Sequence, residues 1–573
     1  MYCSNACKQR AKRALAKLAA DADGAAATQN VSRLGKETTE FPTPRRPAET
    51  SAGAKRDTDV DAARSDAARL RKAARYSRRR TLWRITGDVA CKGCGRALMD
   101  PSSGVIVAQT AAGTSVVLGL MRCGRIWLCP VCAATIRHKR AEEITAAVVE
   151  WIKRGGTAYL VTFTARHASK DRLADLMDAL QGTRKTPDTP RRPGAYQRLI
   201  TGGTWAGRPE RGVDGIRDRI GYVGMIRATE VTVGQAHGWH PHIHAIVLVG
   251  GRTTGEKRDK TVAGTFTPTE ASLAEWEDHW RTTWTRTLKA INPKFRPTDD
   301  CERADCSCGG KGHGVDFKRL HTERDANDLA EYIAKTQDGK SPALELARGD
   351  LKTAAGENVT PFQLLGRIGD LTGGVPEDDA AGCGSLEWNL ARWHEYERAT
   401  KGRRAIEWTR YLRQMLGLDG GDTEDDDLDL LLAADADGGE LRAGVAVTET
   451  GWHAVTKRAL DLAATEAAEG TDGNTDPDAM ASRVRDVLAL ADVADTVVVL
   501  GPQQVADAYA EMLESLARRR EEAAARRRRE AENDGDQDDA EARQEHARNH
   551  IARLSGATGD WRPKTVCLRD QVT

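Results

Sequence analysis

The sequence lacks any apolar run close to the roughly 18 residues that a membrane-spanning helix needs. Its first eight residues contain no apolar core of the kind found in secretory signals. We therefore expect a cytoplasmic protein with no membrane partner. No internal repeat is visible, and 573 residues are enough for two or three domains with cores of their own.

A disulfide scaffold is not expected either, because such scaffolds belong mainly to small secreted domains. Several of the twelve cysteines fall in pairs, which indicates zinc instead. The net charge of +2 hides an uneven distribution, about +15 over residues 71–350 and about −9 over residues 411–450. A basic body suggests a polyanion as partner, although an ordinary solvated surface is the alternative reading of this charge.

Composition divides the chain into five expected parts. They are a basic, mostly disordered segment (1–80), a zinc-binding module (81–150), a main domain (151–410), an acidic linker (411–450) and a helical, charged C-terminal region (451–573). Apolar periodicity predicts helices over residues 133–153, 171–181, 271–290, 325–336 and 386–416. It predicts strands over residues 158–164, 222–233 and 240–249.

The clearest motif is the predicted strand that contains His242 and His244. Side chains two residues apart in a strand share a face, so these imidazoles point the same way and can hold one metal ion. His240 lies on that face too and is a further candidate. Both faces of the strand are otherwise apolar, so we expect it to be central in its sheet. The alternative is a pair of core histidines bonded to the backbone.

A third ligand follows from the hairpin that these strands would form. If residues 234–238 are its loop, Val233 pairs with Trp239, and Glu230 lies opposite His242 with Cβ atoms about 5 Å apart. A carboxylate beside two imidazoles suits Mg²⁺ or Mn²⁺ working on phosphate, although imidazole also tolerates zinc.

A second motif lies in the predicted helix 325–336, where Asp328 and Tyr332 are one turn apart and Lys335 is near. A phenol with a pKa of about 10 is a weak nucleophile. A metal ion that polarises a phosphate, together with a nearby cation, makes attack by the tyrosine feasible. The tyrosine would then hold a 5′ phosphate and leave a free 3′-OH. The alternative is a tyrosine that only packs in the core.

Three segments in this order resemble the motifs of the HUH endonucleases, in particular the single-tyrosine initiators of rolling-circle plasmid replication from actinobacteria. They are the Thr-rich strand at residues 160–164, the His-hydrophobic-His strand at residues 239–244, and the Tyr-x-x-Lys segment from Tyr332 to Lys335. The resemblance spans roughly residues 85–410, and its second motif is the most specific.

The resemblance implies an α+β fold, in which a central antiparallel sheet with flanking helices carries the metal on its middle strands. It implies site-specific nicking and joining of plasmid origin DNA through a 5′-phosphotyrosine at Tyr332, with Lys335 as the nearby cation. In some members an acidic residue four positions before the tyrosine activates water for the terminating cleavage. Asp328 occupies that position here, where glutamate is more familiar.

The partners implied by the resemblance are origin DNA, as a single-stranded or cruciform nick site plus duplex, and the host helicase and replication machinery. Tyr396 is a rival nucleophile, but it has Arg392 rather than an acid four residues earlier and no lysine three residues later. Three other functions stay open: a conjugative relaxase, a transposase of the same superfamily, and a non-catalytic zinc DNA-binding regulator. Relaxases usually place the tyrosine ahead of the histidines, whereas here it follows them.

Two CxxC pairs predict a structural zinc ion held by four thiolates in a tetrahedron. The expected ligands are Cys91, Cys94, Cys129 and Cys132. Cys123 is expected to be a spare thiol. A further group, whose irregular spacing leaves metal binding open, consists of Cys301, Cys306, Cys308 and His313.

Overall fold

The computed structural model of the chain describes most of the region from residue 69 to residue 518. The described segments are residues 69–99, 104–111, 113–184, 190–254, 261–298, 313–320, 358–373, 384–418, 431, 441–469, 476–493, 498–518, 521–522 and 525. Among them, no helix is long and apolar enough to cross a membrane. The expected mixture of helices and antiparallel strands is confirmed.

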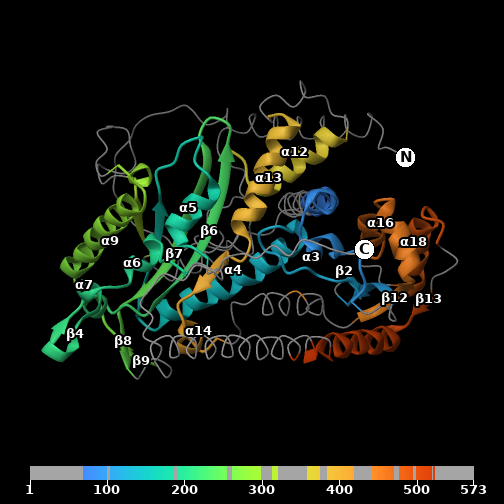
Figure 1. Ribbon diagram of the computed structural model, residues 1–573. Coiled ribbons are helices and arrows are strands. Elements are labelled where there is room, and N and C mark those ends of the chain that lie inside the picture. Colours follow the sequence, from blue (N-terminus) through green and yellow to red (C-terminus); the bar gives the residue numbers. More distant parts are fainter. Residues whose placement is uncertain are drawn as a thin grey trace, which may run out of the picture. The chain divides into compact units, whose positions relative to one another are not determined.

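The larger sheet is antiparallel and has the strand order β10-β3-β7-β6-β11. Its two long strands, β6 and β7, lie side by side in Figure 1. Its strands are β3 (Thr157–Thr164), β6 (Gly224–Gly234), β7 (Gly238–Val249), β10 (Val315–Leu320) and β11 (Ile406–Trp408). The histidine strand β7 is therefore central, as its two apolar faces predict. Every residue from Ile243 to Val249 is buried.

The hairpin of β6 and β7 has the register that the sequence predicts. Val233 pairs with Trp239, and Glu230 pairs with His242. The turn requires glycine at position 238, where φ is +71° and a Cβ atom would lie 2.7 Å from the Cα of Ser169. This register fixes which side chains of the two strands share a face.

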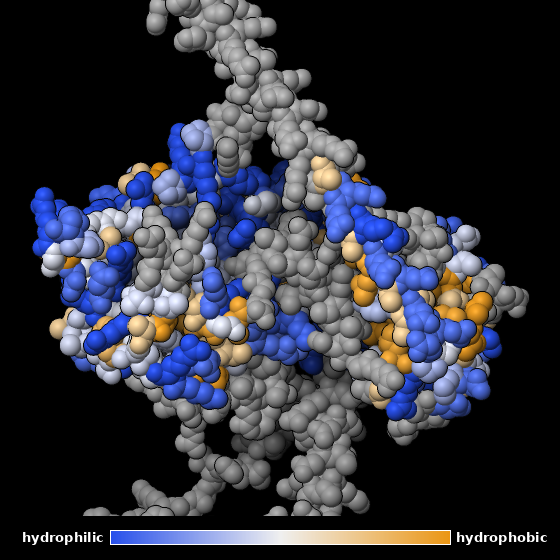
Figure 2. Space-filling view, turned by 90° about the horizontal axis from the view of Figure 1, so that it is seen from below, coloured by the Kyte–Doolittle hydropathy of each residue, from blue (hydrophilic) through white to orange (hydrophobic). Residues whose placement is uncertain are grey.

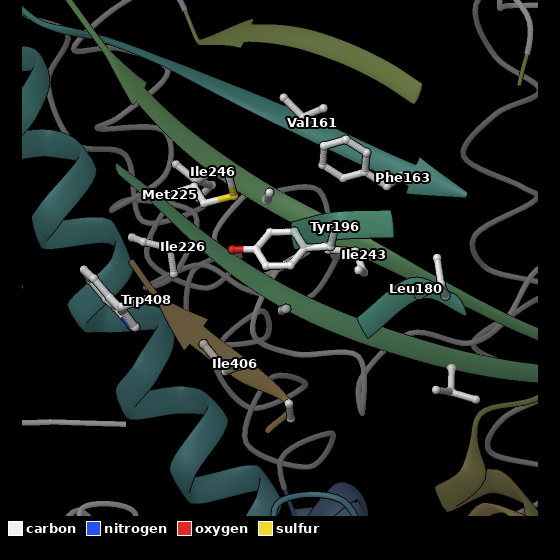
Figure 3. Close-up of a cluster of buried hydrophobic side chains, with 14 of the residues drawn as sticks. Val161, Phe163, Leu180, Tyr196, Met225, Ile226, Ile243, Ile246, Ile406 and Trp408 are labelled. Atoms are coloured by element: carbon white, nitrogen blue, oxygen red, sulfur yellow. The ribbon is translucent and has the colours of Figure 1, made fainter. Parts of the chain in front are cut away.

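Helices cover one face of this sheet along its length. They are α5 (Leu173–Gln181), α6 (Ala195–Leu199) and α9 (Glu270–Ile291). Phe163 of β3 packs on Trp280 and Trp284 of α9, with ring centroids 5.6 Å and 5.0 Å apart. Helix α9 has the period of four residues between its buried tryptophans that this packing needs. Figure 3 shows Phe163 and Ile243 among the apolar side chains of this core.

Helix α4 (Pro130–Lys153) packs on the sheet at the end opposite to the histidines. The indole nitrogen of Trp151 donates to the carbonyls of Thr157 and Val249, at 3.2 Å and 3.1 Å. Farther along, the helix lies beside Trp408 (Figure 3). Helix α4 therefore does not cover the end of this face at which the histidines lie.

The helix predicted over residues 386–416 is correct only in its first half. Helix α13 spans Leu386–Thr400, and the chain then forms strand β11 and the short helix α14 (Leu412–Met415). Gly402 takes a φ of +70°, which a right-handed helix cannot continue through. Residues 406–408 gain sheet hydrogen bonds at the free edge of β6, and these replace the helical ones.

A second antiparallel sheet joins segments that the sequence analysis assigns to different parts. Its order is β13-β12-β1-β2. The strands are β1 (Val105–Thr110), β2 (Ser115–Leu118), β12 (Leu441–Val447) and β13 (Val498–Leu500). The first two come from the expected zinc module, β12 lies inside the expected acidic linker, and β13 comes from the expected C-terminal region. The C-terminal region therefore completes a β-structure rather than forming helices alone.

Helices pack on both faces of this second sheet. On one face are α16 (Glu449–Lys457), α17 (Asp461–Ala467) and α18 (Pro477–Ala489), which share a core with Val105 and Val445. On the other face, Val505 and Met512 of the helical segment 502–518 pack on Ile106. In the face that Figure 2 shows, hydrophobic residues gather mainly on the side of these C-terminal elements.

The helical residues 69–85 are tied to this C-terminal region by a buried ion pair. Asp461 is fully buried, and its carboxylate oxygens lie 2.9 Å from the guanidinium groups of Arg79 and Arg80. Removing one partner of such a pair is costly because it leaves an uncompensated buried charge. Segments separated by more than 300 residues are thus held together.

Candidate metal centres

Glu230, His242 and His244 lie together on one face of the β6–β7 hairpin. The Nε2 atoms of His242 and His244 are 3.2 Å and 3.3 Å from the Oε2 atom of Glu230. The two imidazole rings are 4.6 Å apart and nearly perpendicular. One donor atom from each residue lies within 4.8 Å of the other two. The structure thus brings together the three side chains that the sequence analysis grouped.

This donor set fits a single divalent ion. Ligand atoms bound at about 2.1 Å lie about 3.0 Å apart when they are neighbours in an octahedron, and about 3.4 Å apart in a tetrahedron. The observed separations from the carboxylate oxygen fall between these values. Two imidazole nitrogens and a carboxylate oxygen suit Mn²⁺ or Zn²⁺, and Mg²⁺ where water and phosphate supply further ligands.

Thr162 orients one of the imidazoles from the neighbouring strand β3. Its register partner is His244, and its Oγ1 atom lies 3.1 Å from the Nδ1 atom of that histidine. A contact at Nδ1 leaves Nε2 directed toward Glu230, as required of a metal ligand. Thr162 is the middle residue of the Thr-rich strand, so the structure gives that segment a positioning role.

Burial differs among the three side chains. The side chains of His244, Glu230 and His242 are 5%, 9% and 13% exposed. The carboxylate is held between two imidazoles in a largely water-free setting, where a cation would be strongly attracted.

Two further histidines extend this cluster. The rings of His167 and His240 stack at 4.6 Å, and His240 is 5.1 Å from His242. Burial, together with the neighbouring His242 and His167, lowers the pKa of His240 to about 3. Sequence reasoning missed His167. It follows β3 by three residues, and the pairing of Thr164 with His242 is the signal that could have found it.

The predicted tyrosine motif lies outside the described residues. This applies to Asp328, Tyr332 and Lys335, so the structure does not place them. The rival Tyr396 is described, and it is 3% exposed with its hydroxyl donating to the carbonyl of Trp127 at 2.9 Å. Burial raises the pKa of Tyr396. A core phenol with an engaged hydroxyl is poorly suited to attack DNA.

A second cluster consists of cysteines at the start of α4 and in the preceding segments. The Sγ atom of Cys94 lies 3.5 Å from that of Cys132 and 3.7 Å from that of Cys129, and Cys123 lies 3.7 Å from Cys132. Zinc–sulfur bonds of about 2.3 Å in a tetrahedron separate sulfur atoms by about 3.8 Å. The spacing of these thiols therefore fits one zinc ion.

The four mutually close thiols include Cys123, which the sequence analysis set apart as a spare thiol. Cys91 lies outside this group of four, with its sulfur 3.9 Å from that of Cys123. Cys123 joins the group because two backbone hydrogen bonds of 2.8 Å hold the segment before it against the first CxxC pair. The N–H of Gly95 donates to the carbonyl of Met121, and the N–H of Met121 donates to the carbonyl of Ala97. The spacing of the cysteines along the sequence does not indicate this contact.

The other cysteine group cannot be compared with its prediction. Cys301, Cys306 and Cys308 lie outside the described residues, and only His313 is described. His313 precedes β10, and its backbone N–H donates to the carbonyl of Thr298. Metal binding by this group remains a prediction.

Comparisons with known proteins include a family model whose range covers the histidine hairpin. A family model described as "Putative transposase" matches residues 224–337, a range that begins with β6 and includes Tyr332. No solved structure matches the chain.

Two Streptomyces proteins match most of the chain. A protein of Streptomyces cyanogenus with the name "Neomycin resistance protein" is 45% identical over 436 residues, which are 74% of this chain and 96% of that protein. A protein of Streptomyces lividans with the name "Protein rep" is 78% identical over 467 residues, which are 80% of this chain and 100% of that protein. The chain therefore belongs to the family of this Streptomyces Rep protein.

Proposed function

We propose that the protein initiates rolling-circle replication of a plasmid by nicking its origin, as a single-tyrosine HUH endonuclease. The observation that carries this proposal is the convergence of Glu230, His242 and His244 on two adjacent central strands. The name of the Streptomyces lividans relative supports a role in replication. The transposase family model supports DNA strand chemistry in residues 224–337. The nicking domain would span residues 151–410.

Glu230, His242 and His244 would hold a Mg²⁺ or Mn²⁺ ion. Such an ion withdraws charge from a scissile phosphate and so favours attack on phosphorus. Thr162 would keep His244 in the orientation in which its Nε2 atom can hold the ion. Buried strands on both sides of β7 hold these ligands rigidly, which keeps the site ready without rearrangement.

The proposed reaction is a transesterification by Tyr332. Its phenol oxygen forms a bond to phosphorus, and the bond from phosphorus to the 3′ oxygen breaks. The phenol proton passes to solvent, and the departing 3′ oxygen takes up a proton to become a free hydroxyl. Lys335 lowers the cost of the phenolate form. Asp328 would activate water in the later step, which releases the 5′ phosphate from the tyrosine.

The cysteine cluster would hold a structural zinc ion. Cys94, Cys123, Cys129 and Cys132 provide four sulfur atoms, which fill a tetrahedron and leave no position for a substrate. The ion would fasten the start of α4 to the segments around Cys94 and Cys123. Origin DNA, as a single-stranded or cruciform nick site plus duplex, would be the substrate, with host helicase and replication machinery as further partners.

A covalent-adduct experiment tests the endonuclease. Single-stranded oligonucleotides from the plasmid origin are incubated with the protein and Mn²⁺ and run on a denaturing gel. We expect a protein–DNA adduct whose nucleotide maps to Tyr332. Tyr332→Phe, which removes only the hydroxyl, should abolish it, and Asp328→Ala should form the adduct but resolve it slowly. Binding without any adduct would instead indicate a non-catalytic regulator.

The second candidate function is a transposase with the same chemistry. The observation that favours it is the family model over residues 224–337. The same adduct experiment separates the two functions when oligonucleotides from the plasmid origin compete with those from the ends of a mobile element. Preference for origin strands supports the initiator, and preference for element ends supports the transposase.

A further inference from the structure

Residues 401–404 form a ridge between two hollows of the protein. This segment, which we call the 401–404 ridge, connects α13 to the edge strand β11. One hollow has a volume of about 630 Å³ and the other about 670 Å³, and all four residues of the ridge line both. The ridge is therefore open to a ligand from two sides.

Positive charge dominates the walls of both hollows. The larger hollow contains six cationic side chains, from Arg184, Arg191, Arg227, Lys401, Arg403 and Arg404. Among the lining residues that the structure describes, the only carboxylate is that of Glu407. The smaller hollow adds Arg125, Arg140 and Arg398, with Asp88 and Glu397 as its carboxylates. Cations thus outnumber acids on both sides of the ridge.

Two of the arginines serve as scaffold. Arg403 pairs with Asp178 and donates to the carbonyls of Gly182 and Ala399 at 3.0 Å each. Arg227 pairs with Glu407 and stacks on the ring of Tyr196 at 4.1 Å. These contacts fix the ridge against α5 and β6, and they occupy the carboxylates of Asp178 and Glu407.

Five other cations are exposed and keep their charge uncompensated. They are Arg184, Arg191, Arg398, Lys401 and Arg404. Within the described residues none of the five forms an ion pair. Burial lowers the pKa of Arg403, and repulsion by Arg184 and Arg191 lowers it further, although Asp178 raises it. Cations this close to one another favour a polyanion as ligand.

The ridge also leads to the histidine cluster. Ile406 of β11 pairs with Ala228 of β6, and the N–H of Thr229 donates to the carbonyl of Ala405 at 2.9 Å. Ala405 directly follows the ridge, and Thr229 directly precedes Glu230 in β6. The end of the ridge thus meets β6 one residue before Glu230.

We propose that the 401–404 ridge and its two hollows bind the sugar–phosphate backbone of DNA beside the nick site. The proposal rests on the proposed function, because it takes the Glu230 cluster as the place of cleavage. Exposed cations on several elements and on both sides of the ridge suit a chain of phosphates better than a single phosphate ion. Each phosphate that they contact releases counterions and adds to the salt dependence of binding.

The test measures how salt weakens DNA binding. Lys401→Gln, Arg404→Gln and the double variant are compared with Arg485→Gln and Lys457→Gln, which remove exposed charges from α18 and α16. The probe is a fluorescent duplex of random sequence, titrated between 0.1 M and 1 M salt. The slope of log affinity against log salt is negative, and each lost contact should make it less steep by about 0.9. Over this tenfold range of salt, the loss of affinity should therefore be about eightfold smaller for each lost contact. The control variants should behave as the wild type.

An unchanged slope in the double variant would overturn the proposal. So would inorganic phosphate that displaces the duplex at matched ionic strength, since this would indicate a site for one phosphate ion. The covalent-adduct experiment is run in parallel on the same proteins. A reduced slope without any wild-type adduct supports the ridge and rejects the endonuclease, whereas an adduct with an unchanged slope does the reverse.

Discussion

The histidine–glutamate cluster and the cysteine cluster differ in how the chain builds them. The first takes all its ligands from one hairpin, residues 230–244, where strand alternation and register place them. The second collects thiols from three segments, around Cys94, around Cys123 and at Cys129 to Cys132. One cluster is the product of regular local structure, and the other is a junction between distant segments.

The number and type of donors separate the two clusters as well. Four thiolates complete a tetrahedron, whereas three mixed donors leave positions for water or a phosphate oxygen. A closed site can only hold the fold together, and an open site can take part in a reaction. We therefore expect the cysteines to stabilise the fold and the histidines to take part in the chemistry, and substitutions can test each expectation.

The largest effect is expected at the cysteines. Cys129→Ser or Cys94→Ser should remove the zinc ion, whose binding free energy in structural sites is about 10–16 kcal/mol, and folded yield should fall with it. Zinc content by atomic absorption and yield of monodisperse protein measure this. A zinc-free wild-type protein that is fully folded would contradict it.

Cys123 and Cys91 provide a matched pair within the same cluster. Because Cys123 belongs to the four mutually close thiols and Cys91 does not, Cys123→Ser should lose zinc, and Cys91→Ser should keep about one ion per chain. Metal analysis of the two variants side by side decides the ligand set. The opposite result would restore the ligands expected from the two CxxC pairs.

The next largest effect is expected at the histidine cluster. Glu230→Ala, His242→Ala and His244→Ala should each reduce nicking by about 1000-fold or more, because the reaction depends on one ion. Binding of DNA should change little, since it depends on many phosphate contacts. Zinc content serves as the control for folding. Full activity of Glu230→Ala would show that this carboxylate is not the third ligand.

A smaller effect is expected one contact away from the metal ligands. Thr162→Val keeps the shape of the side chain and removes the hydroxyl that faces Nδ1 of His244. Loss of such an outer contact weakens metal affinity by about 10- to 100-fold. Titration with Mn²⁺ measures the change, and zinc at the cysteines should stay constant. Equal Mn²⁺ affinity in wild type and variant would show that Thr162 does not position His244 for metal binding.

The smallest effect is expected at Tyr396, whose hydroxyl bonds to the segment just before Cys129. Tyr396→Phe removes the hydrogen bond to the carbonyl of Trp127, two residues before Cys129, and should lower the free energy of unfolding by about 1 kcal/mol. Chemical denaturation measures this, and adduct formation should be unchanged. Loss of the adduct would indicate that Tyr396, and not Tyr332, is the nucleophile.

The sequence by itself determined the grouping of Glu230, His242 and His244. Strand alternation and a short hairpin are local rules, so the register could be worked out from residues fewer than fifteen positions apart. The same holds for the helices at 133–153 and 271–290, whose apolar periods are local. The tyrosine helix at 325–336 stays a prediction, since it lies outside the described residues.

Only the tertiary structure decided which distant segments meet. The pairing of β1 with β12, the addition of residues 406–408 to the edge of β6, and the entry of Cys123 into the thiol cluster all join separate segments. The sequence of a strand does not indicate which other strand it will pair with. A single cysteine has no neighbouring cysteine whose spacing would indicate a metal site. These contacts are selected by burial and by backbone hydrogen bonds of the whole fold, and these depend on segments up to several hundred residues away.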